Sequence, residues 1–181
     1  MISGFITNLG KYNEGELVGE WIEFPISEED LQAVLTRIGI GSTDDFGSPY
    51  EEYFFTDWDL PSGMDWEIFG EYPNINQVNE VAEAIEESSY PEDVVSAVFD
   101  HYSYDIDAAI ETLRNSEFMF YPNVDDATSL AEYAINDIDG GIENLSKETL
   151  QDYFDYEAYG RNMEVSGSIE YLDSGAIEFF K

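Results

Sequence analysis

The chain has 181 residues, with 41 aspartates and glutamates against 6 lysines and arginines, for a formal net charge of −35. This balance excludes direct binding to nucleic acid or to an anionic membrane surface, because both need a basic patch. Cysteine is absent, which excludes disulfides, zinc–cysteine sites and thiol catalysis. Hydrophobic residues make up 43% of the chain and aromatic residues 15%, enough to form a folded core.

The N-terminal third of the chain predicts a small sheet with one helix. Residues 2–9 and 17–24 have strand patterns, and the glycines and Asn13 between them favour a turn at 10–16 that pairs the two as a hairpin. Ser27 is a predicted N-cap for a helix through residue 38, because apolar residues follow it at helical spacing. Residues 51–58 predict a third strand.

The middle of the chain changes to a helical period. Three helices are predicted, over about residues 76–87, 91–101 and 105–115. Pro91 suits the first turn of the second helix, and Asp105 is a predicted cap for the third.

The C-terminal third mixes both patterns. A short strand is predicted at residues 117–121, helices at 125–138 and from 146 through 163, and a hairpin over 166–180. The chain is therefore predicted to be α+β. Its three small units are expected at 1–72 (antiparallel sheet plus helix), 73–116 (helical) and 117–181 (α+β).

The acids form no block but are spread along the whole chain. Solvated helix faces explain their placement but not the shortage of cations, because soluble surfaces normally mix both signs. Three explanations for the shortage of cations remain open: a salt-adapted acidic binding domain, a calcium-dependent module, and imitation of a polyanion. Duplex DNA carries one charge per ~1.7 Å of its axis, so 35 charges correspond to roughly 60 Å of duplex.

The sequence offers little for catalysis or metal binding. Asp137, Asp139 and Glu148 fit three positions of a calcium-binding loop, but isoleucine stands where that loop needs glycine. The single histidine, His101, falls near a predicted helix end, where it favours the helix dipole. Phosphate-binding and dinucleotide-binding glycine motifs are absent from the sequence. We therefore expect no enzyme activity, no cofactor and no metal.

The expected localisation rests on the lack of signal-peptide and membrane-helix patterns in the sequence. The N-terminal stretch lacks the basic and apolar regions of a signal peptide, and no apolar run approaches the roughly 20 residues of a membrane helix. We expect a cytoplasmic protein.

Two stretches resemble the ArdA-type antirestriction proteins. One is NLGKYNEGELVGEWIEFP (residues 8–25), similar to that family's N-terminal signature, and the other is YFDYEAYGRNM (residues 153–163), similar to its antirestriction motif. Between them, EEYFFTDWD and EYPNINQVNEVAEAIEE fall where the family has its third strand and central helices. Gly160 and Asn162 stand where the family motif has alanine and aspartate, a difference that bears on the range of partners more than on the fold.

The resemblance implies a non-enzymatic DNA mimic from a mobile genetic element such as a phage, plasmid or conjugative transposon. Family members are elongated three-domain homodimers that occupy the DNA-binding groove of type I restriction-modification enzymes, at the methyltransferase core, and so protect incoming DNA in the bacterial cytoplasm. They bind neither nucleic acid nor membrane directly.

The resemblance and the charge together give the expected site. The acids expected to stand in for phosphates are Glu14, Glu16, Glu20, Glu23, Asp57, Asp59, Glu80, Glu83, Glu87, Asp125, Asp126, Glu132, Asp152, Asp155 and Glu157. The residues expected to pack the antirestriction motif are Tyr153, Tyr156, Tyr159 and Arg161.

Overall fold

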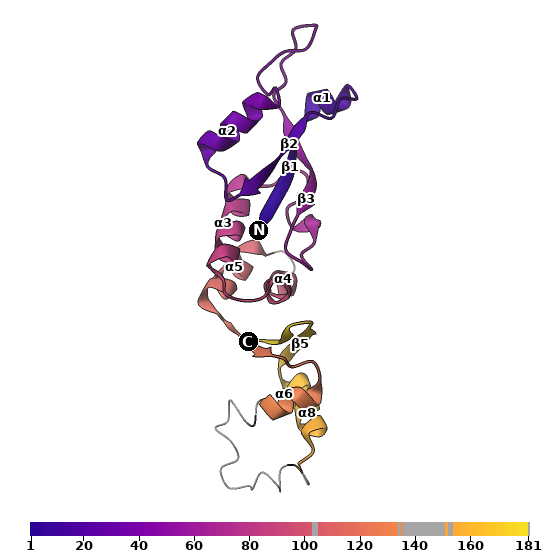
Figure 1. Cartoon of the computed structure of the whole chain (residues 1–181), viewed down its shortest axis with the longest axis vertical. Coiled ribbons are helices and arrows are strands. Elements are labelled where there is room, and N and C mark those ends of the chain that lie inside the picture. Colours follow the sequence, from indigo (N-terminus) through magenta and orange to yellow (C-terminus); the bar gives the residue numbers. More distant parts are fainter. Residues whose placement is uncertain (103–104, 134, 136–150, 152–153, 181) are drawn as a thin grey trace.

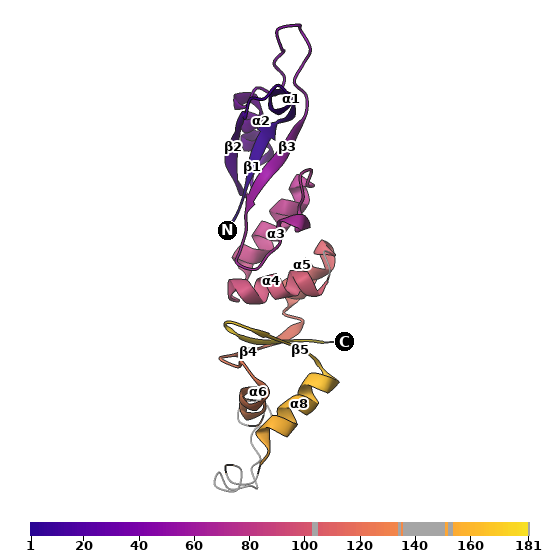
Figure 2. The same ribbon diagram turned by 90° about the vertical axis from the view of Figure 1, so that its right-hand side faces the viewer.

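The elements of the chain follow one another along a single long axis (Figures 1 and 2). A sheet with one covering helix lies at one end, three helices lie in the middle, and a second sheet with two helices lies at the other end. This computed structural model describes residues 1–102, 105–133, 135, 151 and 154–180. The predicted α+β class and elongated shape are confirmed.

The N-terminal sheet has the strand order β2-β1-β3. Strand β1 (Ile2–Asn8) pairs antiparallel with β2 (Gly19–Phe24), as predicted for a hairpin, and on its other side with β3 (Tyr53–Asp59). Helix α2 (Glu28–Arg37) adds its apolar side to the buried cluster beneath this sheet. Its predicted cap is confirmed, because the Ser27 side chain accepts a hydrogen bond from the backbone N–H of Asp30 at 3.1 Å.

The predicted turn after β1 is wrong in part, because its first residues form a short helix, α1 (Leu9–Asn13). Asn8, which is fully buried, explains the difference. Its side-chain oxygen accepts from the Lys11 N–H at 3.0 Å and caps α1, while its amide donates to the Ile38 carbonyl at 3.0 Å. The second bond satisfies the end of α2, so a contact 30 residues away fixes this cap.

Three helices fill the middle of the molecule: α3 (Ile75–Glu87), α4 (Glu92–His101) and α5 (Ile106–Asn115). The three predicted helices are confirmed to within a residue or two. Pro91 precedes α4 as its N-cap, and the Asp105 carboxylate caps α5 by accepting from the Ala108 N–H at 3.3 Å. Between β3 and α3, a single short 3-10 turn, η1 (Trp66–Ile68), leads the chain back toward the helices.

The C-terminal sheet has the order β4-β6-β5, with every pair antiparallel. Its strands are β4 (Phe118–Pro122), β5 (Ser168–Leu172) and β6 (Gly175–Phe179), and β5 with β6 is the predicted hairpin. Helices α6 (Ala127–Tyr133) and α8 (Tyr156–Ser166) pack against each other below it (Figure 2). The helix predicted over 125–138 begins two residues later than predicted, and residues 134 and 136–138 lie outside the described residues. The helix predicted from 146 through 163 is wrong in part, because residues 154 and 155 are not helical and the Asp155 side chain caps a separate helix. Residues 146–150 and 152–153 of that prediction lie outside the described residues.

Alternation in β6 shows that this second sheet is covered on both faces. Ile177 and Phe179 join the large apolar cluster that runs through the N-terminal sheet and the middle helices. Ala176, which points to the opposite face, joins a small cluster with Tyr121 and Leu130. The division into units 1–72, 73–116 and 117–181 stays a prediction, because the large cluster has members in all three.

None of the helices in the described ranges is both long enough and apolar enough to cross a bilayer.

Candidate partner-binding surface

The acids expected to face a partner lie along the full length of the elongated fold. Asp152 falls outside the described residues, Glu20 is half-buried, and the others are exposed. They occupy the N-terminal sheet and α1, then α3, and finally α6 and α8 with their preceding turns. The structure therefore distributes them over the surface and gathers them into no single cleft.

All four lysine and arginine side chains within the described residues are already neutralised by acids of the expected set. The ion pairs are Lys11 with Glu14 and Glu16, Arg37 with Glu20, Arg114 with Glu83 and Glu87, and Arg161 with Glu157. The expected set thus contains two kinds of acid: those paired with a cation and those without one. The second kind presents uncompensated charge to solvent.

Lys11 shows how firmly one of these pairs is held. Its ammonium lies 4.8 Å from the centre of the Tyr50 ring and 3.2 Å from the Glu14 carboxylate. The Tyr50 hydroxyl in turn donates to Glu14 at 2.8 Å. The Tyr50 hydroxyl, followed by Glu14, raises the pKa of Lys11 above its ordinary value, so this cation stays charged.

Unpaired acids come together on the outer face of the N-terminal sheet. Residues directly opposite each other in a sheet share a face. Two successive cross-strand rows on this face are Glu23, Ser3 and Asp59, and then Trp21, Phe5 and Asp57. The Trp21 and Phe5 rings meet edge to face at 5.6 Å, and Trp21 is 50% exposed. Three expected acids therefore lie beside a partly exposed aromatic pair, as suits a protein-binding surface.

A second acidic face lies across α3 and α5. Glu80 shares a surface hollow of about 300 Å³ with Asp107 and Glu111, which sequence analysis did not single out. The two missed acids are four residues apart on α5, so the helical period placed them on one face. Arg114 lines the same hollow and binds acids of α3, which partly compensates the charge there.

A third acidic region, also missed, lies between α4 and β5 (Figure 2). Asp93, Asp100, Glu170 and Asp173 line a hollow of about 300 Å³ there. Burial, with repulsion from Asp65, raises the pKa of Asp100. These acids come from segments about 70 residues apart in the sequence, so no local pattern reveals them.

At the C-terminal end, the acids act first as helix caps. The carboxylate of Asp155 accepts from the Ala158 N–H at 2.8 Å and caps α8. Hydrogen bonds from the Ser129 backbone and hydroxyl lower the pKa of Asp126 and keep it ionised before α6. Asp125 and Glu132 are exposed nearby.

The aromatic residues of the antirestriction motif pack locally. Tyr156 and Tyr159 are half-buried and lie around Phe154, with ring centres 4.9 Å and 5.5 Å from it. Tyr153 lies outside the described residues. Arg161 binds Glu157 one turn earlier in α8, which holds one of the expected acids in place.

The structure describes the candidate histidine but not the candidate calcium loop. Asp137, Asp139 and Glu148 lie outside the described residues, and within the described ranges no three metal-binding side chains gather. His101 ends α4, as predicted, and its ring stacks on Phe179 with 3.6 Å between ring centres and 6° between planes. The histidine therefore helps to seat the C-terminal sheet on the middle helices.

Comparison with known proteins agrees with this arrangement. No curated protein matches the sequence. The sequence profile of the antirestriction protein (ArdA) family matches residues 4–178, nearly the whole chain. This match covers the acidic sheet face, the middle helices and the motif in α8. The chain therefore belongs to the ArdA antirestriction protein family, whose members are inhibitors and act against restriction enzymes.

Proposed function

We propose that this protein is a DNA mimic that occupies the DNA-binding groove of a type I restriction-modification enzyme. One observation carries the proposal: unpaired acids are exposed from one end of an elongated fold to the other, while all described lysine and arginine side chains are already bound to acids. A DNA-binding groove is lined with lysine and arginine, which neutralise the phosphates and release the cations condensed around this polyanion. Carboxylates arranged along a rod release them in the same way.

The shape supports this proposal as much as the charge does. A groove built for duplex DNA accepts a long, narrow object, and the stacked layers of this chain form one (Figure 1). We propose further that two copies form a homodimer, which doubles the length of the acidic surface. The inhibitor acts by occupancy alone, without a cofactor or catalysis, in the cytoplasm of a bacterial host carrying a mobile element.

A competition experiment tests the proposal. The methyltransferase core of a type I enzyme is loaded with its fluorescently labelled recognition duplex, and the protein is titrated in the presence of EDTA. We expect full displacement of the duplex, and no shift of the duplex by the protein alone. EDTA removes calcium, so displacement under these conditions also separates a mimic from a calcium-dependent module.

A ternary complex that retains the duplex, or direct binding of the protein to DNA, contradicts the proposal. Circular dichroism in low salt is the control for a salt-adapted protein. A salt-adapted chain unfolds there, because its acidic surface needs screening. We expect this chain to keep its helical signal.

A further inference from the structure

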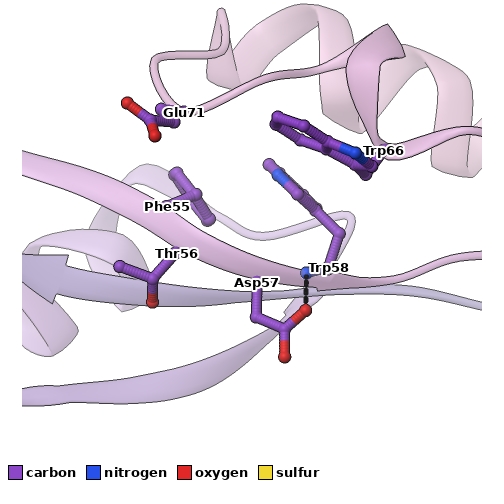
Figure 3. A pocket seen from close by; sticks show the side chains of 6 residues that line it. All are labelled: Phe55, Thr56, Asp57, Trp58, Trp66 and Glu71. Atoms are coloured by element: carbon purple, nitrogen blue, oxygen red, sulfur yellow. Dashed lines mark hydrogen bonds between the residues drawn. The ribbon is translucent and has the colours of Figure 1, made fainter.

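A cavity of about 260 Å³ at the free edge of β3 combines aromatic walls with acids. Its lining residues are Phe55, Thr56, Asp57, Trp58, Trp66 and Glu71 (Figure 3). The rings of Phe55 and Trp58 lie on the same side of the strand as Trp66 and Glu71, whereas Thr56 and Asp57 point to the other side. The cavity therefore opens at the border between the packed face of the sheet and its acidic outer face.

The floor of this cavity is rigid. The Trp58 ring stacks on Phe55, with 4.6 Å between ring centres and 13° between planes, and lies 5.0 Å from Phe69. Its indole N–H donates to the Gly70 carbonyl at 2.9 Å, which fixes the ring within its plane. A ring held in this way is preorganised for a ligand, because no conformational freedom is left to lose.

The outer wall is Trp66, a large apolar side chain that remains 53% exposed. Its backbone is held, because the Trp66 carbonyl accepts from the N–H groups of Phe69 at 3.2 Å and Gly70 at 3.1 Å. Within the described residues its indole has neither a ring partner nor a hydrogen bond. An exposed indole on a fixed turn is unusual for a side chain that only fills space, and typical of one that contacts a ligand.

The charge around the cavity is negative throughout. Glu71 closes the end opposite Trp66 in Figure 3, and Asp57 lies on the adjoining strand face. The Glu71 backbone is fixed to the strand edge by the hydrogen bond from the Phe55 N–H to its carbonyl at 2.8 Å. All lysine and arginine side chains of the described residues are engaged in ion pairs elsewhere, so none of them neutralises this aromatic and acidic cavity.

We propose that this cavity receives an arginine side chain from the basic groove of the partner enzyme. Aromatic faces beside carboxylates attract cations, and tryptophan does so most strongly. A planar guanidinium stacks on such rings and leaves its N–H groups free to bind a carboxylate, whereas a lysine ammonium is compact and more strongly hydrated. The inference rests on the proposed function, to which it adds one specific anchor point within an otherwise diffuse ionic surface.

The first experiment probes the cavity without the partner enzyme. N-acetyl-L-arginine amide is titrated into the full chain labelled with ¹⁵N, and the three tryptophan indole N–H signals are followed. We expect a saturable shift at Trp66 and Trp58, a weaker one with N-acetyl-L-lysine amide, and none at Trp21. Trp21 is the internal control, because it is 50% exposed and adjoins acids but lies outside the cavity.

The second experiment measures binding to the methyltransferase core with matched variants. Trp66→Leu keeps an apolar side chain but loses the aromatic face, and we expect about tenfold weaker binding, within the range of cation–π contacts. Trp66→Phe restores part of the affinity. Phe46→Leu, which changes a 94% exposed ring at a distant loop, is expected to change affinity less than about twofold. Melting temperatures confirm that each variant is folded.

The outcomes separate this inference from the proposed function. If the native chain displaces DNA and Trp66→Leu does so equally well, the arginine anchor is wrong while the mimic stands. If the native chain fails to displace DNA, the proposed DNA-mimic function is wrong. The arginine titration then still shows whether the cavity binds arginine. An arginine shift that survives Trp66→Leu, or one that appears equally at Trp21, overturns the inference.

Discussion

The two sheets of this molecule each have three antiparallel strands, but their surroundings differ. The N-terminal sheet is covered on one face only, and its other face carries Glu23, Asp57 and Asp59 around an aromatic pair. The C-terminal sheet is covered on both faces, by the middle helices and by α6 with α8. In the first unit the strands themselves display acids. At the C-terminal end, helices and turns expose the acids instead, because both faces of the sheet are packed.

The two ends also differ in how they are stabilised. The N-terminal sheet shares a large cluster in which Phe24, Phe55 and Trp58 contact one another. Below the C-terminal sheet, the described residues bury a smaller cluster, which includes Tyr121 and Leu130. The C-terminal end therefore depends on a few close contacts, and each of them is a sensitive place to test this difference.

The largest effect is expected from Gly160→Ala in α8. A β-carbon at this position lies 1.7 Å from the carbonyl oxygen of Ala127 in α6, so the two helices must move apart. Although alanine favours a helix over glycine, we expect the free energy of unfolding to fall by about 3 kcal/mol. Urea unfolding followed by circular dichroism measures it. This close approach explains why the position between α6 and α8 suits glycine.

Asn162→Ala is the matched control, because Asn162 is exposed on the same helix. It should change stability by less than about 0.5 kcal/mol. Equal melting of both variants would show that α6 and α8 are not packed at this distance, and the contrast between the two ends would lose its main support.

The next effect concerns the bond that joins the C-terminal hairpin to the middle helices. Ser174 donates to the Asp93 carboxylate from its N–H at 2.8 Å and from its hydroxyl at 2.6 Å. Ser174→Ala removes the hydroxyl bond and should cost about 1–2 kcal/mol of stability, as for hydrogen bonds to charged groups. Differential scanning calorimetry of the variant at pH 7 and at pH 3 measures this cost.

The pH dependence gives the sign of this contribution. Burial opposes ionisation of Asp93, but the hydrogen bonds from the Ser174 side chain, the Ser174 backbone and the Val94 N–H outweigh it and lower its pKa. In the unfolded chain the pKa of this aspartate is about 4, so the ionised group gives its full stabilisation well above that pH. The stabilisation is lost as the pH falls through the lower pKa of the folded state. The difference between Ser174→Ala and the native chain should shrink on acidification; a constant difference argues against this link.

A third prediction compares unpaired with paired acids. Neutralising the sheet-face acids together, as Glu23→Gln, Asp57→Asn and Asp59→Asn, should weaken binding to the methyltransferase core about fivefold, on the order of 1 kcal/mol. It should also flatten the dependence of affinity on salt, because ionic attraction is screened. Isothermal titration calorimetry at several salt concentrations measures both quantities.

The control for this comparison removes the same amount of charge at paired positions, as Glu20→Gln, Glu83→Gln and Glu87→Gln. These carboxylates already face Arg37 or Arg114, so we expect a smaller loss of affinity. Should both triple variants lose affinity equally, net charge alone governs binding, and the local placement of acids carries no information.

The smallest effect is expected at the antirestriction motif. In the triple variant Asp152→Asn, Asp155→Asn and Glu157→Gln, the Asp155 cap is preserved by asparagine, and Glu157 is already bound to Arg161. We expect about twofold weaker binding, a slightly flatter salt dependence and an unchanged melting temperature. An unchanged salt dependence would remove this segment from the partner-binding surface and leave it a structural helix.

The sequence by itself determined the order and type of nearly all elements in the described chain. Caps such as Ser27 and Asp105, and the alternating pattern of the C-terminal hairpin, are local signals, because a cap or a strand face needs only residues a few positions away. The net charge and the shortage of cations likewise indicate a basic partner, because both follow from composition and need no knowledge of the fold.

Tertiary structure decided which acids are free and where they meet. Arg37 reaches Glu20 across 17 residues and Arg114 reaches Glu87 across 27, distances over which no sequence pattern specifies a partner. The same holds for Asn8, whose bond to Ile38 turns an expected loop into α1, and for Trp58 and Trp66, which line one cavity only because η1 folds back on β3. Ionic and aromatic contacts depend on distance in space, and only the packing of the core sets that distance.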